Sequence, residues 1–178
     1  MRKLTTFVVV VALAAGLAAC NKHGAKNVYG CPSKGPGVGF KGVKSGKVTV
    51  QTVLPDPGYW KGASVDTLTG GYEFELAKDV CAQLGVGRVR IVNVARTALQ
   101  SGQTRDFDLA IAHIAITDER GKNVDVSTAY FTSAQGAQYA VLLPKGSANT
   151  KLVNAAIAKL KTNGTLDALS KRWPTPAG

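Results

Sequence analysis

The sequence predicts an α/β fold built around a mostly parallel sheet. From residue 47 to about residue 120, segments with strand character alternate with segments of helical period, in the order strand, helix, strand, short helix, strand. The third strand, Leu109–Ala112, has four consecutive apolar residues, as expected for a strand covered on both faces. A chain of 178 residues has room for one domain of ordinary size.

The N-terminal residues indicate an export signal. Arg2 and Lys3 precede an apolar run, residues 7–17, that is too short to span a bilayer comfortably as a permanent helix. The run ends in Leu-Ala-Ala-Cys20, which resembles the lipobox of bacterial lipoproteins, in which cleavage before the cysteine leaves it as the lipid-modified first residue. We therefore expect residues 1–19 to be a lipoprotein signal peptide and the mature chain to be tethered through Cys20 outside the cytoplasmic membrane.

Residues 20–46 predict a lipidated cysteine followed by a flexible tether, because the segment is rich in Gly, Lys and Pro and has little apolar content. Within it, Gly37–Gly42 satisfies the G-x-G-x-x-G pattern of dinucleotide sites. That site requires a strand before the glycines and a helix after them, whereas here a tether precedes and a strand follows. We interpret these glycines as linker residues and place the folded body at residues 47–178.

The net charge of +11 falls to +9 when Arg2 and Lys3 are removed. The remaining basic residues are scattered, with no dense run longer than a pair, which argues against nucleic-acid binding. An exported basic protein is better suited to anionic lipid, cell-wall polymer or an acidic small molecule.

Two further cysteines, Cys31 and Cys81, lie in the part of the chain expected outside the cytoplasm. A disulfide between them is one alternative, since an oxidising compartment preserves such bonds. The other is a buried free thiol, because Cys81 falls on the apolar face of a predicted helix.

The elements of the first half follow from local patterns. Residues 47–53 form a strand rich in β-branched residues, which ends at a turn containing Asp56 and the aromatic residues Tyr59 and Trp60. These aromatics either fold back on the core or face a ligand. After a loop at residues 64–70, one helix, one strand and one short helix follow at residues 71–85, 89–94 and 95–101.

The strand Leu109–Ala112 leads into a polar corner that ends in Thr117-Asp-Glu-Arg120. Thr117 followed by two acidic residues is the pattern of a helix N-cap. A strand end next to a helix start leaves backbone N–H groups that favour an anion, and Arg120 adds a planar, two-pronged grip on a carboxylate. The alternative is that Thr117 only caps a short helix and that Arg120 is a solvated surface residue.

The C-terminal third predicts a short strand segment at residues 128–131, a strand at residues 138–143 that Pro144 ends, and two closing helices. The helices, residues 149–160 and 165–173, carry apolar residues at helical spacing and are separated by an Asn-Gly pair.

Laid out in this way, the chain resembles the family 3 extracellular solute-binding proteins, the polar amino-acid receptors of ABC importers. The resemblance lies in a Gly-aromatic-acidic signature, in the stretch from a Leu-x-x-Gly turn to a Thr-x-x-Arg corner, and in the closing strand and helices, at residues 71–84, 98–131 and 139–173 respectively. It implies a flavodoxin-like lobe of a type II periplasmic binding protein, with three layers and a mostly parallel central sheet.

The resemblance also implies site residues. In that family the arginine of the Thr-x-x-Arg motif grips the ligand α-carboxylate, which implies Arg120, with Thr117 at the start of the motif. An aromatic residue after the Asp-Pro turn lies over the ligand, which implies Tyr59, with Asp56 and Trp60 in the same turn.

Two residues depart from the family pattern. His113 and Ala115 stand where small polar residues are usual, so a side-chain hydroxyl to the carboxylate is missing and an imidazole would crowd the pocket. For His113 itself, a packed or solvated histidine is the alternative to a ligand contact.

A larger departure is the second lobe. Receptors of this family have two lobes, whereas here residues 131–139 join the two crossing points directly. Only lobe one is expected, and a ligand on it would stay open to water unless a partner or a second copy of the chain covers the face.

These observations favour a membrane-anchored, extracytoplasmic solute-binding lipoprotein of an ABC-type amino-acid import system, with a polar amino acid and a permease as partners and a homodimer as one way to cover the ligand. The alternative is an exported module that docks on a permease, a sensor or a cell-wall component without capturing a solute. Enzyme activity is disfavoured, because the chain has two histidines, one of them in the tether, and neither metal-ligand spacing nor a Ser-His-Asp pattern. No cofactor is expected.

Overall fold

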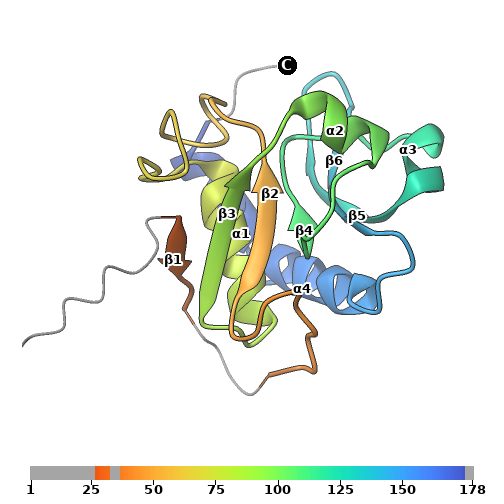
Figure 1. Ribbon diagram of the computed structural model, residues 1–178. Coiled ribbons are helices and arrows are strands. Elements are labelled where there is room, and N and C mark those ends of the chain that lie inside the picture. The colour runs from red at the N-terminus through yellow and green to blue at the C-terminus, as the bar shows by residue number, and fades with distance from the viewer. Residues whose placement is uncertain (1–26, 33–36, 175–178) are drawn as a thin grey trace, which may run out of the picture.

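The computed structural model describes residues 27–32 and 37–174. These residues form one six-stranded sheet whose three central strands are parallel and whose outer strands pair antiparallel (Figure 1). In spatial order the strands are β1 (Val28–Gly30), β3 (Arg88–Asn93), β2 (Val48–Thr52), β4 (Leu109–Ala110), β6 (Gln138–Pro144) and β5 (Val124–Thr132). The α/β fold with a parallel centre is confirmed.

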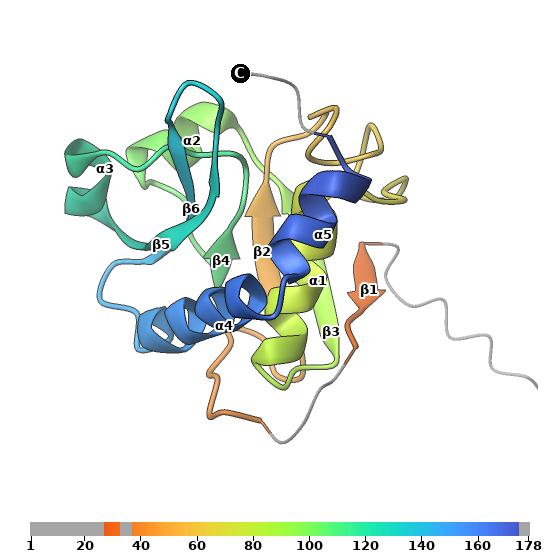
Figure 2. The same cartoon turned by 180° about the vertical axis from the view of Figure 1, so that it is seen from behind.

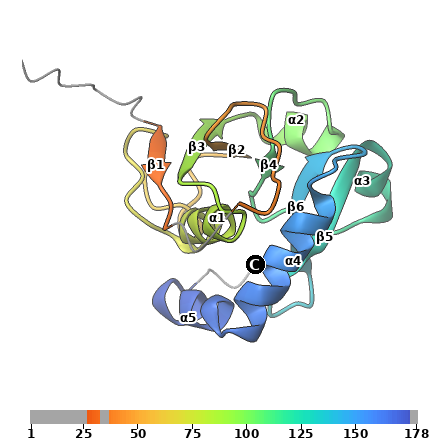
Figure 3. The same cartoon turned by 90° about the horizontal axis from the view of Figure 1, so that it is seen from below.

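Helices cover both faces of the sheet and complete the three layers. One face carries α1 (Tyr72–Gln83), α4 (Thr150–Thr162) and α5 (Thr165–Arg172), as Figures 2 and 3 show. On the opposite side lie α2 (Arg96–Ser101) and, next to it and to β5, α3 (Asp118–Asn123).

The continuous apolar run of the third strand follows from this layering. Leu109 and Ile111 belong to the large core cluster on the α1 side, whereas Ala110 and Ala112 belong to a smaller cluster with Leu99 of α2. Since successive side chains of a strand point to opposite faces, both sets must be apolar when both faces are covered. The regular strand is shorter than predicted, because β4 ends at Ala110.

Part of the segment expected to be a flexible tether, residues 20–46, contacts the folded body. Val28–Gly30 pairs antiparallel with β3, and the Tyr29 hydroxyl donates to the Val65 carbonyl at 2.6 Å. Further along, the Val43 N–H donates to Asp108 at 2.7 Å. Individual hydrogen bonds hold this segment against the folded body, although the segment contains no long apolar stretch. Residues 37–42, with the glycine pattern, form neither strand nor helix, while Cys20, the predicted signal peptide and residues 21–26 and 33–36 lie outside the described residues.

A disulfide joins Cys31 to Cys81, across 50 residues of sequence. Cys31 follows β1 and Cys81 lies in the buried face of α1, so the bond fastens the N-terminal segment to the central helix. Cys81 is therefore part of a disulfide and is not a buried free thiol.

The structure has a tight turn where a second lobe would enter. The carbonyl of Ala137 accepts the Ser133 N–H at 2.8 Å, and the Ser133 hydroxyl accepts the Ala137 N–H at 3.1 Å, which closes the β5–β6 hairpin. The described chain is therefore a single lobe. Among its helices, none has the length and apolar character needed to cross a membrane.

The disulfide gives the first testable prediction. Replacing Cys31 and Cys81 together by serine should lower the free energy of unfolding by about 4 kcal/mol, because the unfolded chain loses a closed loop of about 50 residues. Urea unfolding of the mature chain and of the double variant measures the difference. A reducing agent should lower the midpoint of the mature chain only, and equal stability of the two proteins would contradict the prediction.

Candidate ligand-binding site

The loops that follow β2 and β4 meet at one edge of the sheet. β3 lies on one side of β2 and β4 on the other, so the chain reverses its direction of winding at this point (Figure 1). In open α/β sheets, ligands bind in the crevice at the carboxyl ends of the strands where this reversal occurs. Asp56 and Tyr59 come from the loop after β2, and His113 comes from the loop after β4.

Asp56, Tyr59 and His113 are in direct contact. The carbonyl of Asp56 accepts the Trp60 N–H at 2.8 Å, which forms a tight turn and brings Tyr59 over the end of the sheet. Nδ1 of His113 donates to the Asp56 carboxylate at 2.7 Å, since a carboxylate oxygen is an acceptor. The imidazole stacks on the Tyr59 ring at a centroid distance of 4.6 Å and an interplanar angle of 22°.

The buried Glu73, in the first turn of α1, holds three segments of this site together. One of its carboxylate oxygens accepts the backbone N–H of His113 at 2.5 Å and the hydroxyl of Tyr130. The other accepts the indole N–H of Trp60 at 2.7 Å. Burial raises the pKa of Glu73 to about 7, against the opposing effect of the hydrogen bonds from Tyr130 and His113.

The ligand atoms of Asp56, Glu73 and His113 lie within 4.8 Å of one another, which is close enough to consider a metal ion. Their contacts describe a different arrangement. His113 bonds directly to Asp56, and both oxygens of Glu73 already accept protein donors. We therefore interpret the three groups as a satisfied hydrogen-bond network that fixes the two loops.

The Thr117 corner forms as the capping pattern predicted. The Thr117 hydroxyl accepts the Arg120 N–H at 3.3 Å and begins α3. The Arg120 guanidinium turns back along the chain, and its Nη1 donates to the Ala115 carbonyl. Its Nε is buried and has no hydrogen-bond partner among the described residues, and burial lowers the pKa of the group.

Tyr139 of β6 joins this corner to the Asp56 group. It forms a β-bridge with Ala115, and its ring lies edge-on to Tyr59 and His113 at centroid distances of 6.2 and 6.0 Å. Of the predicted site residues, Asp56, Tyr59 and His113 form one group, while Ala115, Thr117 and Arg120 form the adjoining one.

The Trp60 side chain belongs to neither group, although its backbone bonds to Asp56. Only 1% of its surface is exposed, and its indole supports Glu73 within the core instead of offering a ring to this edge. Sequence reasoning missed two contributors, Glu73 and Arg96. The signal for Glu73 was an acidic residue between two aromatic residues, Tyr72 and Phe74, at the start of a helical segment. Arg96, at the start of α2, lies 3.9 Å from the Asp56 carboxylate and gave no signal.

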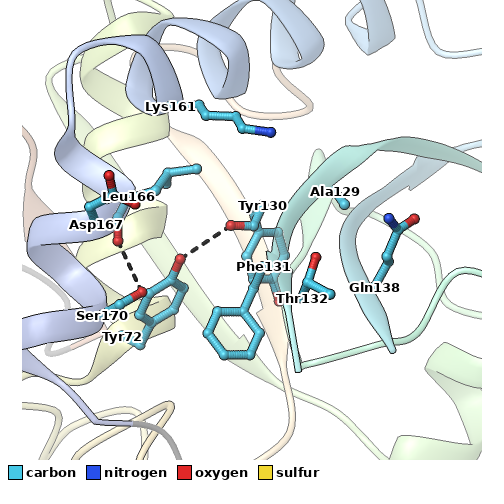
Figure 4. Close-up of a pocket in the computed structure, with 10 residues that line it drawn as sticks. All are labelled: Tyr72, Ala129, Tyr130, Phe131, Thr132, Gln138, Lys161, Leu166, Asp167 and Ser170. Atoms are coloured by element: carbon cyan, nitrogen blue, oxygen red, sulfur yellow. Dashed lines mark hydrogen bonds between the residues drawn. The ribbon is translucent and has the colours of Figure 1, made fainter. Parts of the chain in front are cut away.

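A separate cavity of about 290 Å³ lies between α5 and the β5–β6 hairpin (Figure 4). Tyr130 links the cavity to the site, because it lines the cavity and its hydroxyl donates to Glu73. The Tyr72 hydroxyl donates to the Tyr130 carbonyl at 3.3 Å. Burial raises the pKa of Tyr72 to about 12. The lining includes none of the predicted site residues; it consists of Tyr72, Ala129, Tyr130, Phe131, Thr132, Gln138, Lys161, Leu166, Asp167 and Ser170.

Residues 55–176 match the model of the bacterial extracellular solute-binding proteins, family 3. The chain belongs to this family. A match that includes both site loops and the closing helices confirms the predicted resemblance, and membership of an extracellular family places the protein outside the cytoplasm. Comparison with curated protein sequences gave no match.

Three solved structures with the same fold are described as amino-acid-binding proteins or solute-binding proteins. Domain 1 of TmArgBP in its arginine-bound form is 26% identical, with a TM-score of 0.57 over 65% of this chain and 94% of that one. An amino-acid ABC transporter substrate-binding protein from Streptococcus pneumoniae, bound to L-arginine, is 18% identical, with a TM-score of 0.58 over 75% and 96% of the chains. An ancestral cationic amino-acid solute-binding protein, AncCDT-1, is 18% identical, with a TM-score of 0.61 over 74% and 96%. At 18% identity, the last two structures indicate a shared fold but are not evidence of a shared function.

The raised pKa of Glu73 predicts how stability depends on pH. Between about pH 4.5 and pH 7 the folded chain keeps a proton that the unfolded chain has released, so the free energy of unfolding falls as the pH rises. The loss amounts to about 3 kcal/mol and is complete above pH 7. In Glu73→Gln this contribution is absent, and the difference in unfolding free energy between the two proteins should change over that pH range.

The control for this measurement is Glu119→Gln, which removes a carboxylate that is 79% exposed and should keep the pH profile of the unmodified chain. Unfolding by urea at half-unit steps from pH 4 to pH 8 measures all three proteins. Parallel curves for the unmodified chain and Glu73→Gln would refute the assignment.

Proposed function

We propose that the protein is the solute receptor of an ABC-type amino-acid import system and that Arg120 binds the α-carboxylate of its ligand. The observation that carries this proposal is the Arg120 side chain, which has a buried Nε without a hydrogen-bond partner in the described chain. A buried donor that lacks an acceptor is costly, and a carboxylate would supply two acceptor atoms in the plane of a guanidinium.

The place of Arg120 in the fold supports the same role. The residue follows Thr117 in the corner after β4, and Tyr139, which bridges to Ala115 of this corner, lies edge-on to the Tyr59 ring. Its Nη1 bond to the Ala115 carbonyl holds the guanidinium at the corner and leaves it unpaired with any carboxylate of the described chain. A ligand carboxylate would therefore meet a cation that no carboxylate among the described residues neutralises.

A single lobe is compatible with ligand binding. Domain 1 of TmArgBP, which this chain resembles over most of that domain, is described in an arginine-bound form. On one lobe the ligand keeps much of its contact with water, so its charges are screened and its affinity is low. We propose that a second copy or the permease covers the ligand.

The alternative function is an exported module that docks on a permease, a sensor or a cell-wall component without holding a solute. His113 favours it, because its imidazole fills the space beside Tyr59 and Asp56.

Catalysis is less well supported, although one matched structure is described as a precursor of cyclohexadienyl dehydratase. The carboxylates and the imidazole of the site bond to one another and to protein donors, so we propose binding as the activity.

The anchor belongs to the same proposal. Cleavage before Cys20 and lipidation of its thiol would hold the receptor on the outer face of the cytoplasmic membrane, and the residues between Cys20 and Asn27 would serve as the tether. Globomycin, which blocks lipoprotein signal cleavage, should leave the uncut precursor in cells that express the chain, whereas Cys20→Ser should be secreted or retained without lipid.

Ligand titration tests the receptor proposal. One or more polar amino acids should raise the melting temperature of the mature chain in a saturable way, as expected for a ligand that binds only the folded state. Arg120→Ala should weaken binding roughly 30-fold, because it removes charge-assisted hydrogen bonds worth about 2 kcal/mol.

The matched control is Lys122→Ala, which removes a nearby exposed cation that pairs with Glu119. It should bind like the unmodified chain. Equal affinity of Arg120→Ala and Lys122→Ala would exclude a carboxylate contact at Arg120, and the absence of any thermal shift would favour the docking module.

A further inference from the structure

His113 has an unusual backbone conformation for a residue with a large side chain. Its φ angle is +40°, in the left-handed region, and among the described non-glycine residues it shares a positive φ only with Asp106. Such a conformation costs about 1 kcal/mol and persists where surrounding contacts hold it. The contacts of this residue therefore identify what keeps it in place.

Three kinds of contact hold His113. Its backbone N–H donates to the fully buried Glu73, its Nδ1 donates to Asp56, and its ring packs between Tyr59 and Tyr139. Only 25% of the side chain is exposed. The imidazole is thus a fixed part of the carboxyl edge of the sheet.

The surroundings of the imidazole resemble a binding site for a planar cation. The imidazole donates to a carboxylate that is 11% exposed, that of Asp56, and stacks on a tyrosine ring that is 5% exposed, that of Tyr59. A guanidinium group combines both contacts well, because it stacks on aromatic faces and donates to carboxylates in its own plane. We call this place, bounded by Tyr59 and Asp56, the Tyr59–Asp56 site.

We propose that His113 determines specificity by occupying the Tyr59–Asp56 site with its own imidazole, in the place that the side chain of a guanidinium-bearing amino acid would take. The unmodified chain then favours solutes with short side chains, and a cationic side chain enters only after the imidazole has left. The proposal rests on the proposed function in one respect, that the ligand carboxylate lies at Arg120.

The effect on affinity follows from competition. A ligand that needs the imidazole displaced binds only the fraction of molecules in which the site is open, so its apparent affinity falls by that fraction. A ligand too short to reach the site is indifferent to it. Discrimination between long cationic and short solutes is therefore the signature of the occupied site.

Two substitutions open the site without opposing the backbone. Glycine adopts a φ of +40° freely, and asparagine tolerates it better than most residues while being too short to stack on Tyr59. His113→Gly and His113→Asn therefore remove the ring by two independent routes. If one variant folds poorly, the other provides the measurement.

The first experiment compares L-arginine and L-alanine by calorimetric titration of the mature chain and both variants. L-Arginine should bind the variants at least tenfold more tightly than the unmodified chain, whereas the affinity for L-alanine should change less than threefold. If L-arginine binds His113→Gly and His113→Asn no better than the unmodified chain, or if both ligands gain equally, the proposal is overturned.

The second experiment does not involve Arg120. Ethylguanidinium carries the cation but no carboxylate, and the NMR signals of a ¹³C-labelled Tyr59 ring report its arrival. The probe should shift these signals saturably in His113→Gly, with at least a tenfold higher half-saturation concentration in the unmodified chain, and Asp56→Asn in the same variant should abolish the effect. No response in His113→Gly would refute the occupied site even if amino acids bind at Arg120. A response there together with unchanged affinity in Arg120→Ala would refute the carboxylate role alone.

Discussion

The geometry of the site depends on one buried carboxylate, that of Glu73. Three segments that are distant in the sequence each donate a hydrogen bond to it, namely the turn after β2 through Trp60, the loop after β4 through His113, and β5 through Tyr130. An isolated carboxylate in this environment would be strongly unfavourable, and these donors make its burial tolerable. In return, the carboxylate fixes how the two loops approach each other, because a change in either loop would leave a buried acceptor without its donor.

This constraint explains why a strained histidine persists at the edge of the sheet. The backbone N–H of His113 points inward to Glu73, and its side chain points along the edge to Asp56. Satisfying both bonds from one residue requires a local reversal of the chain, which the positive φ angle provides. The backbone strain at His113 is thus a consequence of these hydrogen bonds, and the position of its imidazole follows from the position of the Glu73 carboxylate.

Local patterns in the sequence were sufficient for most of the fold. The helical period of residues 71–85 and the capping residue Thr117 depend on neighbours three or four positions away, and both are found as predicted. β1 was missed because three residues carry no periodicity, and its partner is about 60 residues away. The pairing of Cys31 with Cys81 was left open for the same reason.

The site was less predictable than the fold. The sequence indicated Asp56, Tyr59 and His113 separately, but the contact between Asp56 and His113 spans 57 residues. The burial of Trp60 and the direction of the Arg120 side chain depend on tertiary packing, which local sequence does not specify.

A single lobe also gives a physical reason for an internal partner at the Tyr59–Asp56 site. In the described chain the β5–β6 hairpin closes with a short turn, so no second lobe covers Asp56 when the ligand is absent. A carboxylate that is largely buried, as that of Asp56 is, needs a donor, and Arg96 at 3.9 Å is too distant for a good hydrogen bond. His113 supplies that donor at 2.7 Å and shields the ring from water. If His113 occupies the site as we propose, stability of the free lobe and affinity for long cationic solutes oppose each other at this residue, as is common where a binding site carries unsatisfied or strained groups. A partner that covered the edge would relieve this opposition, because it would exclude water from Asp56 by other means and allow the imidazole to leave.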